Sequence, residues 1–235
     1  MSLHSKYGYN FGEQCLMMLI TGITNAFTIP VILLMYRKNI IHRAFFGFFT
    51  GFTSFMYHTL ESLDINRVFL DEGQWHRLDN VGSIICFCSL FVFLMDNRDD
   101  ILDLKLEYIA VFISLVAQEK DPWNINYTVI PIMCYVLMFI GVLLWRKRKP
   151  KYNMRMLKKG VIYLSFAIPC FVFALNEHSD YLRFFHGLWH LFIGMGSFYI
   201  WQAKHQICDE IEVMEILFPT PATYEKLRGS SKHFD

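Results

Sequence analysis

Charged residues are scarce in this chain of 235 residues. Asp, Glu, Lys and Arg make up 18% of the sequence, whereas a soluble domain carries about 25%. Glycine and proline are also few, at 13 and 7 residues, and this excludes a collagen-like chain. The low share of charged residues, together with a share of 54% hydrophobic residues, also excludes a disordered chain. The composition therefore does not match that of an ordinary cytosolic enzyme.

The cysteines and the basic residues exclude two further classes of protein. Five of the six cysteines lie within apolar stretches, so they do not form the disulfide framework of a small secreted domain. The one dense basic run, residues 146–159, lies between apolar segments and has no base-stacking motif around it. We therefore expect no nucleic-acid partner. Residues 1–12 are polar and do not resemble a cleavable signal peptide.

Apolar and aromatic residues are abundant, and they fall in segments long enough for membrane helices. Aromatic residues make up 17% of the chain and include 23 Phe. The sequence predicts an all-α, polytopic membrane protein, a bundle of seven transmembrane helices at residues 13–205, with a short N-terminal segment at 1–12 and a tail at 206–235. The predicted spans are 13–35, 44–60, 78–95, 101–117, 124–145, 160–176 and 183–203. The fourth span is the weakest, because Asp103, Lys105 and Glu107 interrupt its start.

The basic residues also predict how the bundle lies in the membrane. Five of the 22 Lys and Arg residues fall on the side of the N-terminus, and seventeen fall on the opposite side. By the positive-inside rule, the N-terminus is extracellular and the C-terminus is cytoplasmic. In the tail, residues 207–218 are amphipathic enough to lie on the membrane as a short helix, although their acidic residues would be repelled by anionic lipid.

Three groups of polar residues lie inside the predicted spans. Each ionisable group there costs about 2.5–3.5 kcal/mol on insertion scales, so each calls for a physical reason. Ser54 and His58 lie one helical turn apart at the end of the second span, and His186 and His190 are likewise spaced at the start of the seventh. Asp79 lies at the start of the third span. The predicted topology places all of them at one depth, near the outer face of the membrane.

Three imidazoles and one open position form the ligand set of a catalytic zinc site. We therefore predict that His58, His186 and His190 bind zinc, and that Asp79 and Ser54 orient and polarise a water molecule at the open position. A single His-x3-His pair is a weak signal, because such histidines more often contact carbonyl groups or lipid headgroups.

Other polar residues near these positions are predicted to have structural or solvated roles. We expect four of them in solvated outer loops: Glu61, His76, Glu177 and His178. The polar residues of the first span are predicted to make helix-packing hydrogen bonds. They are Thr21, Thr24, Asn25 and Thr28.

The motifs Ser54-Phe-Met-Tyr-His58 and His186-Gly-Leu-Trp-His190-Leu, together with Asp79, resemble those of a known superfamily. It contains the alkaline ceramidases and the progestin and adipoQ receptors, which are seven-helix membrane proteins and in many cases zinc-dependent lipid hydrolases. Within it, the amino-acid sequences of the two motifs are most similar to those of the transmembrane protein eight family, in particular its short, myomaker-type members. The resemblance covers residues 44–203, and the short N-terminal segment matches the compact layout of those members.

The resemblance implies a plasma-membrane protein that promotes myoblast fusion, with membrane lipids, a second copy of the chain and a fusion partner protein as candidate partners. It also implies that the zinc site is retained. The tail departs from the vertebrate pattern, because Cys208 is the only cysteine near the membrane and there is no terminal cysteine cluster. Two alternatives remain open at this stage: a zinc-dependent hydrolase that cleaves an amide or ester bond of a lipid, and a receptor without chemistry.

Overall fold

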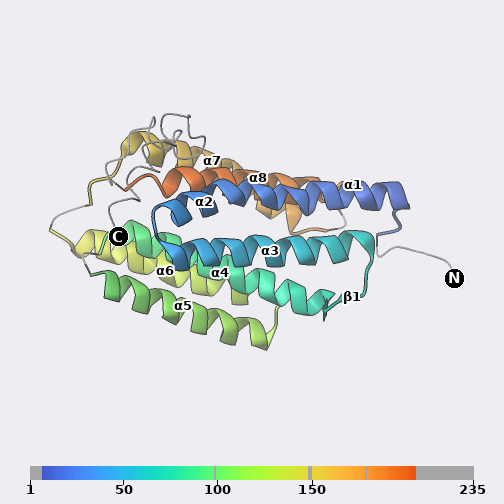
Figure 1. The fold of residues 1–235 in the computed structure, drawn as a ribbon, viewed down its shortest axis with the longest axis horizontal. Coiled ribbons are helices and arrows are strands. Elements are labelled where there is room, and N and C mark those ends of the chain that lie inside the picture. The colour runs from blue at the N-terminus through green and yellow to red at the C-terminus, as the bar shows by residue number, and fades with distance from the viewer. Residues whose placement is uncertain (1–6, 98, 148–149, 178, 205–235) are drawn as a thin grey trace, which may run out of the picture.

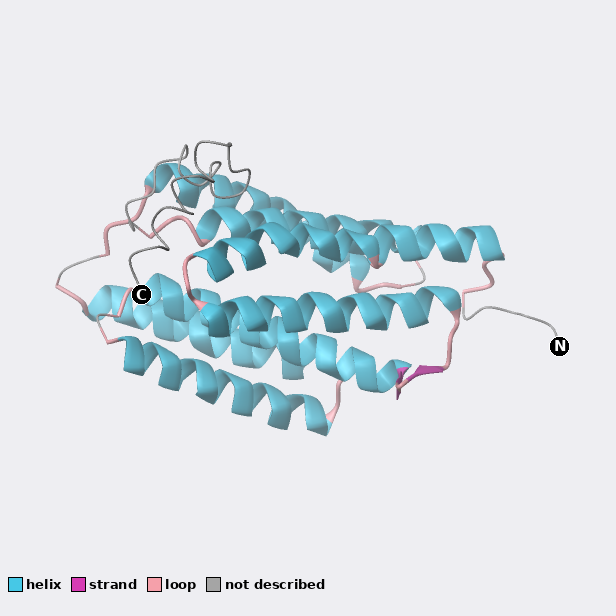
Figure 2. Cartoon of the chain, viewed as in Figure 1, coloured by secondary structure: helices cyan, strands magenta, loops and turns pink. Residues whose placement is uncertain are grey.

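The computed structural model describes residues 7–97, 99–147, 150–177 and 179–204. The described chain is helical apart from two-residue strands β1 (Arg67–Val68) and β2 (Leu70–Asp71), which pair as a small antiparallel hairpin. Figures 1 and 2 show the helices lying side by side along the long axis of the molecule. They are α1 (Phe11–Thr21), the 3-10 helix η1 (Ile23–Thr28), α2 (Ile29–Arg37), α3 (Ile41–Leu63), α4 (Glu72–Met95), α5 (Asp100–Lys120), α6 (Asn126–Trp145), α7 (Met154–Ala174), the 3-10 turn η2 (Tyr181–Arg183) and α8 (Phe184–Ile200). The predicted all-α class is confirmed.

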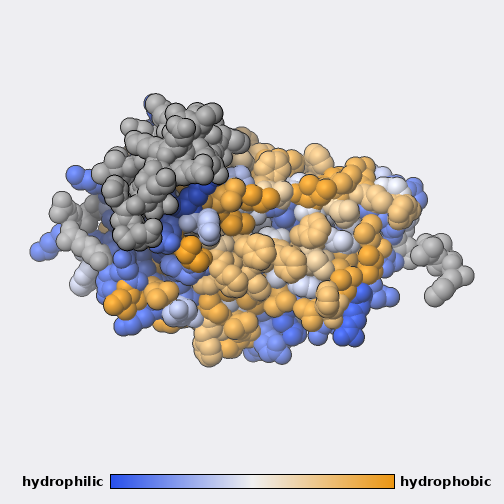
Figure 3. All heavy atoms as spheres, in the orientation of Figure 1, coloured by the Kyte–Doolittle hydropathy of each residue, from blue (hydrophilic) through white to orange (hydrophobic). Residues whose placement is uncertain are grey.

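The helices pack around α4 and α8. Helix α4 contacts α3, α5 and α6, while α8 packs most extensively against α7 and also contacts α1, η1 and α2. We call the end at which α1 begins and α3 ends the N-terminal end of the bundle, and the other the opposite end (Figure 1). Apolar residues gather over the middle of the face shown in Figure 3, and hydrophilic residues gather towards both ends.

Four helical segments are long and apolar enough to cross a membrane, which indicates a membrane protein. They are Phe11–Arg37, which joins α1, η1 and α2, and the helices α4, α6 and α7. Helices α3, α5 and α8 do not combine the length, the hydropathy and the low number of charges of these four segments, so the predicted count of seven spans stays a prediction. The predicted tail, including residues 207–218 and Cys208, lies outside the described residues.

Capping residues place two helix starts earlier than the apolar pattern predicted. The Asp71 side chain accepts a hydrogen bond from the Gln74 backbone amide, and the Gln74 side chain accepts one from the Asp71 backbone amide. Helix α4 therefore begins at Glu72 instead of residue 78. The pair Asn10 and Glu13 forms the same capping box at the start of α1. As a result Asp79 lies two turns inside α4, level with the end of α3.

Pro30 changes the geometry of the first helical segment. Its ring cannot coexist with a normal α-helical carbonyl four residues earlier, and it has no amide hydrogen to donate. The chain accordingly narrows to the 3-10 helix η1 just before Pro30. The Thr24 hydroxyl donates to the Ile20 carbonyl at 2.6 Å and the Thr28 hydroxyl to the Asn25 carbonyl at 2.6 Å. These bonds satisfy backbone groups that the break would leave without partners.

Glycines let α8 approach the first helical segment closely. A Cβ atom added to Gly187 would lie 2.6 Å from the Ile20 carbonyl oxygen, and one added to Gly194 would lie 2.7 Å from the Phe27 carbonyl oxygen. Small residues at such crossings allow helix backbones to touch, which is how helices associate in lipid. This contact sets the position of α8, and with it the positions of His186 and His190.

We predict that Gly187→Ala lowers the thermal stability of the purified protein, because the new methyl group must push α8 away from α1. The cost of such overpacking is about 1–3 kcal/mol. The matched control is Gly141→Ala in α6, where an added Cβ meets nothing within 4 Å. Equal melting temperatures for the two variants would contradict the proposed close contact.

A second polar cluster lies at the opposite end of the bundle, where the sequence predicted only an interruption of the fourth span. Asp103 and Glu107 are buried in α5. Arg43 of α3 donates from Nε to Glu107 at 2.7 Å and lies 3.5 Å from Asp103 through Nη2. The Ser89 hydroxyl adds a hydrogen bond to Glu107 at 2.9 Å. Asn97 donates to Asp103 at 2.7 Å. These charges therefore face inward, and α5 exposes an apolar outer face.

We predict that Arg43→Met destabilises the protein by about 3–5 kcal/mol, because it leaves two buried carboxylates without their cation. The double variant Arg43→Met, Glu107→Gln is expected to recover part of this loss. Arg77→Met is the matched control, since Arg77 pairs with Glu119 on the surface at 3.0 Å and such pairs contribute about 0–1 kcal/mol. Thermal unfolding in detergent measures all three, and equal losses for Arg43→Met and Arg77→Met would contradict the prediction.

Candidate metal centre

Three histidine rings meet at the N-terminal end of the bundle. His58 projects from the last turns of α3, while His186 and His190 lie one turn apart on α8. The ring centroids of His58 and His186 are 4.5 Å apart, and those of His58 and His190 are 5.0 Å apart. One ring nitrogen of each histidine lies within 4.8 Å of those of the other two, as a shared metal ion requires. His58 and His190 are buried.

Hydrogen bonds to the other ring nitrogens orient two of the three rings. His58 Nδ1 donates to the Glu61 carboxylate at 2.9 Å, and His190 Nδ1 donates to the Thr21 carbonyl at 3.0 Å. Each ring therefore turns the lone pair of Nε2 towards the centre of the cluster. His186 Nε2 lies 3.0 Å from His58 Nε2, close to the separation of about 3.3 Å expected for two nitrogens on a tetrahedral zinc ion.

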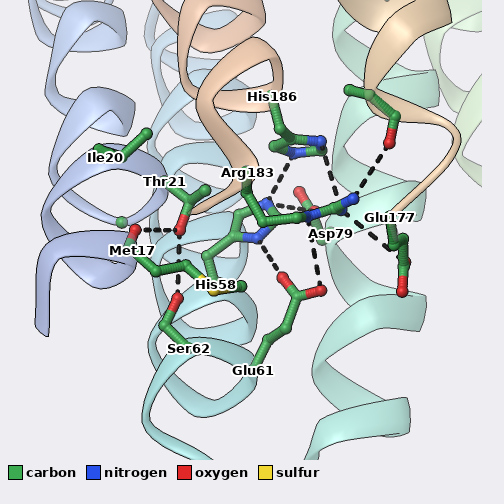
Figure 4. Close-up of polar contacts among 12 residues, drawn as sticks. Met17, Ile20, Thr21, His58, Glu61, Ser62, Asp79, Glu177, Arg183 and His186 are labelled. Atoms are coloured by element: carbon green, nitrogen blue, oxygen red, sulfur yellow. Dashed lines mark hydrogen bonds and ion pairs between the residues drawn. The ribbon is translucent and has the colours of Figure 1, made fainter. Parts of the chain in front are cut away.

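Asp79 and Ser54 lie beside the three rings. The Asp79 carboxylate reaches from α4 to within 4.0 Å of His58 Nε2 (Figure 4). Ser54 is buried one turn before His58 on α3 and lies close to Asp79. The structure thus brings all five predicted site residues together from α3, α4 and α8.

The prediction that Glu61 lies in a solvated loop is wrong. Helix α3 continues to Leu63, so Glu61 belongs to its last turn, three residues after His58 and on the same face. The residue is only 2% exposed, and its carboxylate holds His58. The i, i+3 spacing in the sequence was the available signal. His76 is likewise not in a loop, since it lies in α4 and stacks on Trp123 at 4.0 Å.

A buried arginine adds a positive charge beside the histidines. Arg183 Nε lies 3.7 Å from Glu61, and Nη2 lies 3.5 Å from His186 Nδ1. Leu182 and Arg183 both adopt left-handed backbone conformations, with φ of 53° and 55°. Two such residues in succession are strained, and they turn the chain sharply into α8. The sequence analysis missed Arg183, although it precedes His186 by three residues.

The N-terminal segment covers this end of the site. The Tyr7 hydroxyl donates to Glu61 at 2.8 Å and contacts Glu177 at 3.2 Å. Burial, followed by the charge of Glu61, raises the pKa of Tyr7 well above its usual range, so the phenol stays protonated and remains a donor. Glu177 lies in the turn after α7, as predicted, but it is only partly exposed and also faces Arg183 at 3.8 Å. His178 lies outside the described residues.

The first helical segment also contributes to the site. Thr21 supplies the carbonyl that His190 contacts, and the Thr24 hydroxyl lies 3.2 Å from His190 Nδ1. The Thr21 hydroxyl meets Ser62 of α3 at 3.3 Å. Thr21 and Thr24 therefore make helix-packing hydrogen bonds, as predicted, and in addition fix the ring of a candidate metal ligand.

Together these groups have the chemistry of a divalent-metal site. Three neutral imidazoles suit zinc and other borderline transition metals. Outer hydrogen bonds of the kind made by Glu61 and the Thr21 carbonyl are what orient imidazole ligands in such sites. Asp79 is the further group that can contact a metal-held ligand or the ion itself.

A family model described as "Protein of unknown function (DUF3522)" matches residues 13–191, most of the chain. The chain belongs to the DUF3522 family. A comparison with curated proteins finds no match. In this DUF3522 protein the matched region runs from α1 to the residue after His190 and therefore contains all five site residues.

Proposed function

We propose that this DUF3522 protein is a zinc-holding multipass protein of the plasma membrane that promotes fusion between cells, with the zinc joining helices. The metal assignment rests on one observation: the rings of His58, His186 and His190 lie together, and the Nδ1 atoms of His58 and His190 are already held by hydrogen bonds. The fusion role rests on the resemblance of the two histidine motifs to those of myomaker-type proteins.

The exposed surfaces support seven membrane spans. Helix α3 buries Ser54, His58 and Glu61 and exposes several aromatic residues, among them Phe45, Phe48 and Phe52. Helix α5 buries Asp103 and Glu107 and exposes Ile109, Phe112 and Val116. These buried polar and charged residues therefore face into the bundle, which a bundle in lipid accepts. In the proposed orientation, the N-terminal end of the bundle is extracellular and the opposite end is cytoplasmic.

Two features favour a joining role for zinc over catalysis. The ligands come from α3 and α8, and Thr21 ties the same cluster to the first helical segment, so one ion would join helices distant in sequence. The site is also covered, because Glu61, Arg183 and Tyr7 lie over its outer side. A metal that binds only the folded state stabilises it by about 4 kcal/mol at a thousand times its dissociation constant.

A lipid hydrolase is the second candidate, and Asp79 with Ser54 is the observation that favours it. A zinc ion in this place would polarise a carbonyl group or a water molecule. Asp79 would then accept a proton or hold the reacting group in place, while the Ser54 hydroxyl would keep the Asp79 carboxylate oriented. A joining role does not require Ser54.

We predict about one zinc ion per chain in the purified protein, measured by elemental analysis. The double variant His186→Ala, His190→Ala should lose the zinc and melt at a lower temperature, because the folded state loses its metal. His76→Ala is the control, since that ring lies nearby in α4 but outside the cluster, and it should keep one zinc. Wild-type protein that is folded yet lacks stoichiometric metal would overturn the zinc proposal.

A second prediction separates joining from catalysis. At matched surface levels, Ser54→Ala should mix the contents of two dye-labelled cell populations as wild type does, whereas His190→Ala should not. Thr53→Val is the control, because the Thr53 hydroxyl is buried on the same helix but bonds to its own backbone.

The same variants are to be tested on ceramides and phospholipids. If the protein is a hydrolase, Ser54→Ala should slow turnover by about 10–100-fold, the usual effect of removing a group that orients a residue of a metal site. Lipid turnover by wild type, with both turnover and cell mixing lost in Ser54→Ala, would establish the hydrolase in place of the joining role.

A further inference from the structure

Glu61 occupies a position from which it can control the metal centre without being a ligand. One carboxylate oxygen accepts the hydrogen bond from His58 Nδ1 at 2.9 Å. The other accepts from the Tyr7 hydroxyl at 2.8 Å and faces Arg183 Nε at 3.7 Å. Figure 4 shows the carboxylate below His58 with the Arg183 side chain beside it. Its side chain is fully buried, so these protein groups replace water around the charge.

The three imidazoles differ in what holds their outer nitrogens. His190 Nδ1 contacts a backbone carbonyl, and His186 Nδ1 faces the Arg183 guanidinium at 3.5 Å. His58 alone, among the three rings and in the described part of the chain, has a carboxylate on Nδ1. A carboxylate in this position keeps the proton on Nδ1, orients the ring and makes Nε2 a stronger donor to a metal. The negative charge of Glu61 therefore acts on the three-histidine cluster through His58.

The Tyr7 contact connects the centre to the N-terminal segment. Tyr7 stacks on Tyr9 with ring centroids 5.6 Å apart, and Tyr9 packs edge-on against Tyr181 at 5.7 Å. The Leu182 amide donates to the Tyr9 hydroxyl at 3.1 Å, which ties the segment to the turn that precedes α8. These contacts hold the Tyr7 hydroxyl over Glu61.

We propose that Glu61 is a positioning residue for the metal centre, acting through His58, and that Tyr7 and Arg183 in turn hold Glu61. The strength of metal binding then depends on a tyrosine of the N-terminal segment that does not touch the metal. This inference rests on the proposed zinc site, and it adds a residue and a coupling that the three-histidine assignment does not contain.

The chain offers a matched control in Glu177. Its carboxylate shares both of the other partners of Glu61, since it lies 3.2 Å from the Tyr7 hydroxyl and 3.8 Å from Arg183. It makes no hydrogen bond to any of the three histidines among the described contacts. Glu61→Gln and Glu177→Gln therefore remove the same charge from the same pair of neighbours, and only Glu61→Gln changes the group on His58.

The experiment uses the full chain in lipid nanodiscs. Zinc affinity is measured by competition with a chromophoric chelator, and the ligand field is read from the visible spectrum of the cobalt(II)-substituted protein. Glu61→Gln should weaken zinc binding about 10–100-fold, the usual effect of removing such a partner, and should shift the cobalt spectrum. Tyr7→Phe should shift both in the same direction by a smaller amount. Glu177→Gln should leave both unchanged.

The outcomes separate this inference from the zinc proposal. Wild-type protein without bound zinc would contradict the proposed function itself. Wild type that binds zinc, beside a Glu61→Gln variant with the same affinity and cobalt spectrum, would overturn the positioning role and leave the zinc proposal standing. If Glu61→Gln does not fold, the double variant Glu61→Gln, Arg183→Gln removes both opposed charges, and Tyr7→Phe keeps both. An unchanged cobalt spectrum in these two variants would equally overturn the inference.

Discussion

Polar groups inside an apolar bundle must find partners within it, and the arrangement of these helices follows from that constraint. Water is not available at such positions, so an unpaired charge or amide costs several kcal/mol. The chain meets this requirement with two buried clusters, one at each end. His58, Glu61 and Arg183 belong to one, while Arg43, Asp103 and Glu107 belong to the other.

The two clusters join different helices and differ in chemistry. The cluster at the opposite end is a set of ion pairs between α3 and α5, with Ser89 of α4 between them. Arg43 pairs with both of its carboxylates, and these contacts hold α3 against α5. The cluster at the N-terminal end contains three imidazoles, with one nitrogen of each ring within 4.8 Å of those of the other two. This difference is why, of these two clusters of described residues, the histidine cluster is the candidate for binding a metal ion.

The three histidines can meet because the backbone of α8 lies close to that of the first helical segment. Gly187 lies between His186 and His190 and rests against Ile20 of α1, while Pro30 produces the 3-10 turn on which Gly194 packs. A bulkier residue at Gly187 would move two candidate ligands at once. The packing of α8 on the first helical segment therefore also sets the geometry of the site. The N-terminal segment contacts the site through Tyr7.

The sequence alone determined the helical class and the approximate helix positions, and it singled out the three histidines, Asp79 and Ser54 that the structure brings together. These follow from local properties: apolar runs of membrane length, helical spacing and the cost of ionisable groups in lipid. The tertiary structure decided which other polar residues join them. The burial of Glu61 depended on α3 running three residues beyond its apolar run, and the inward turn of Arg183 depended on two left-handed residues. The pairing of Arg43 with Glu107 joins residues 64 positions apart. The His58–Glu61 spacing was a local signal, but neither propensity nor spacing predicts the contacts of Arg183 or Arg43, because those arise only when distant helices pack and exclude water.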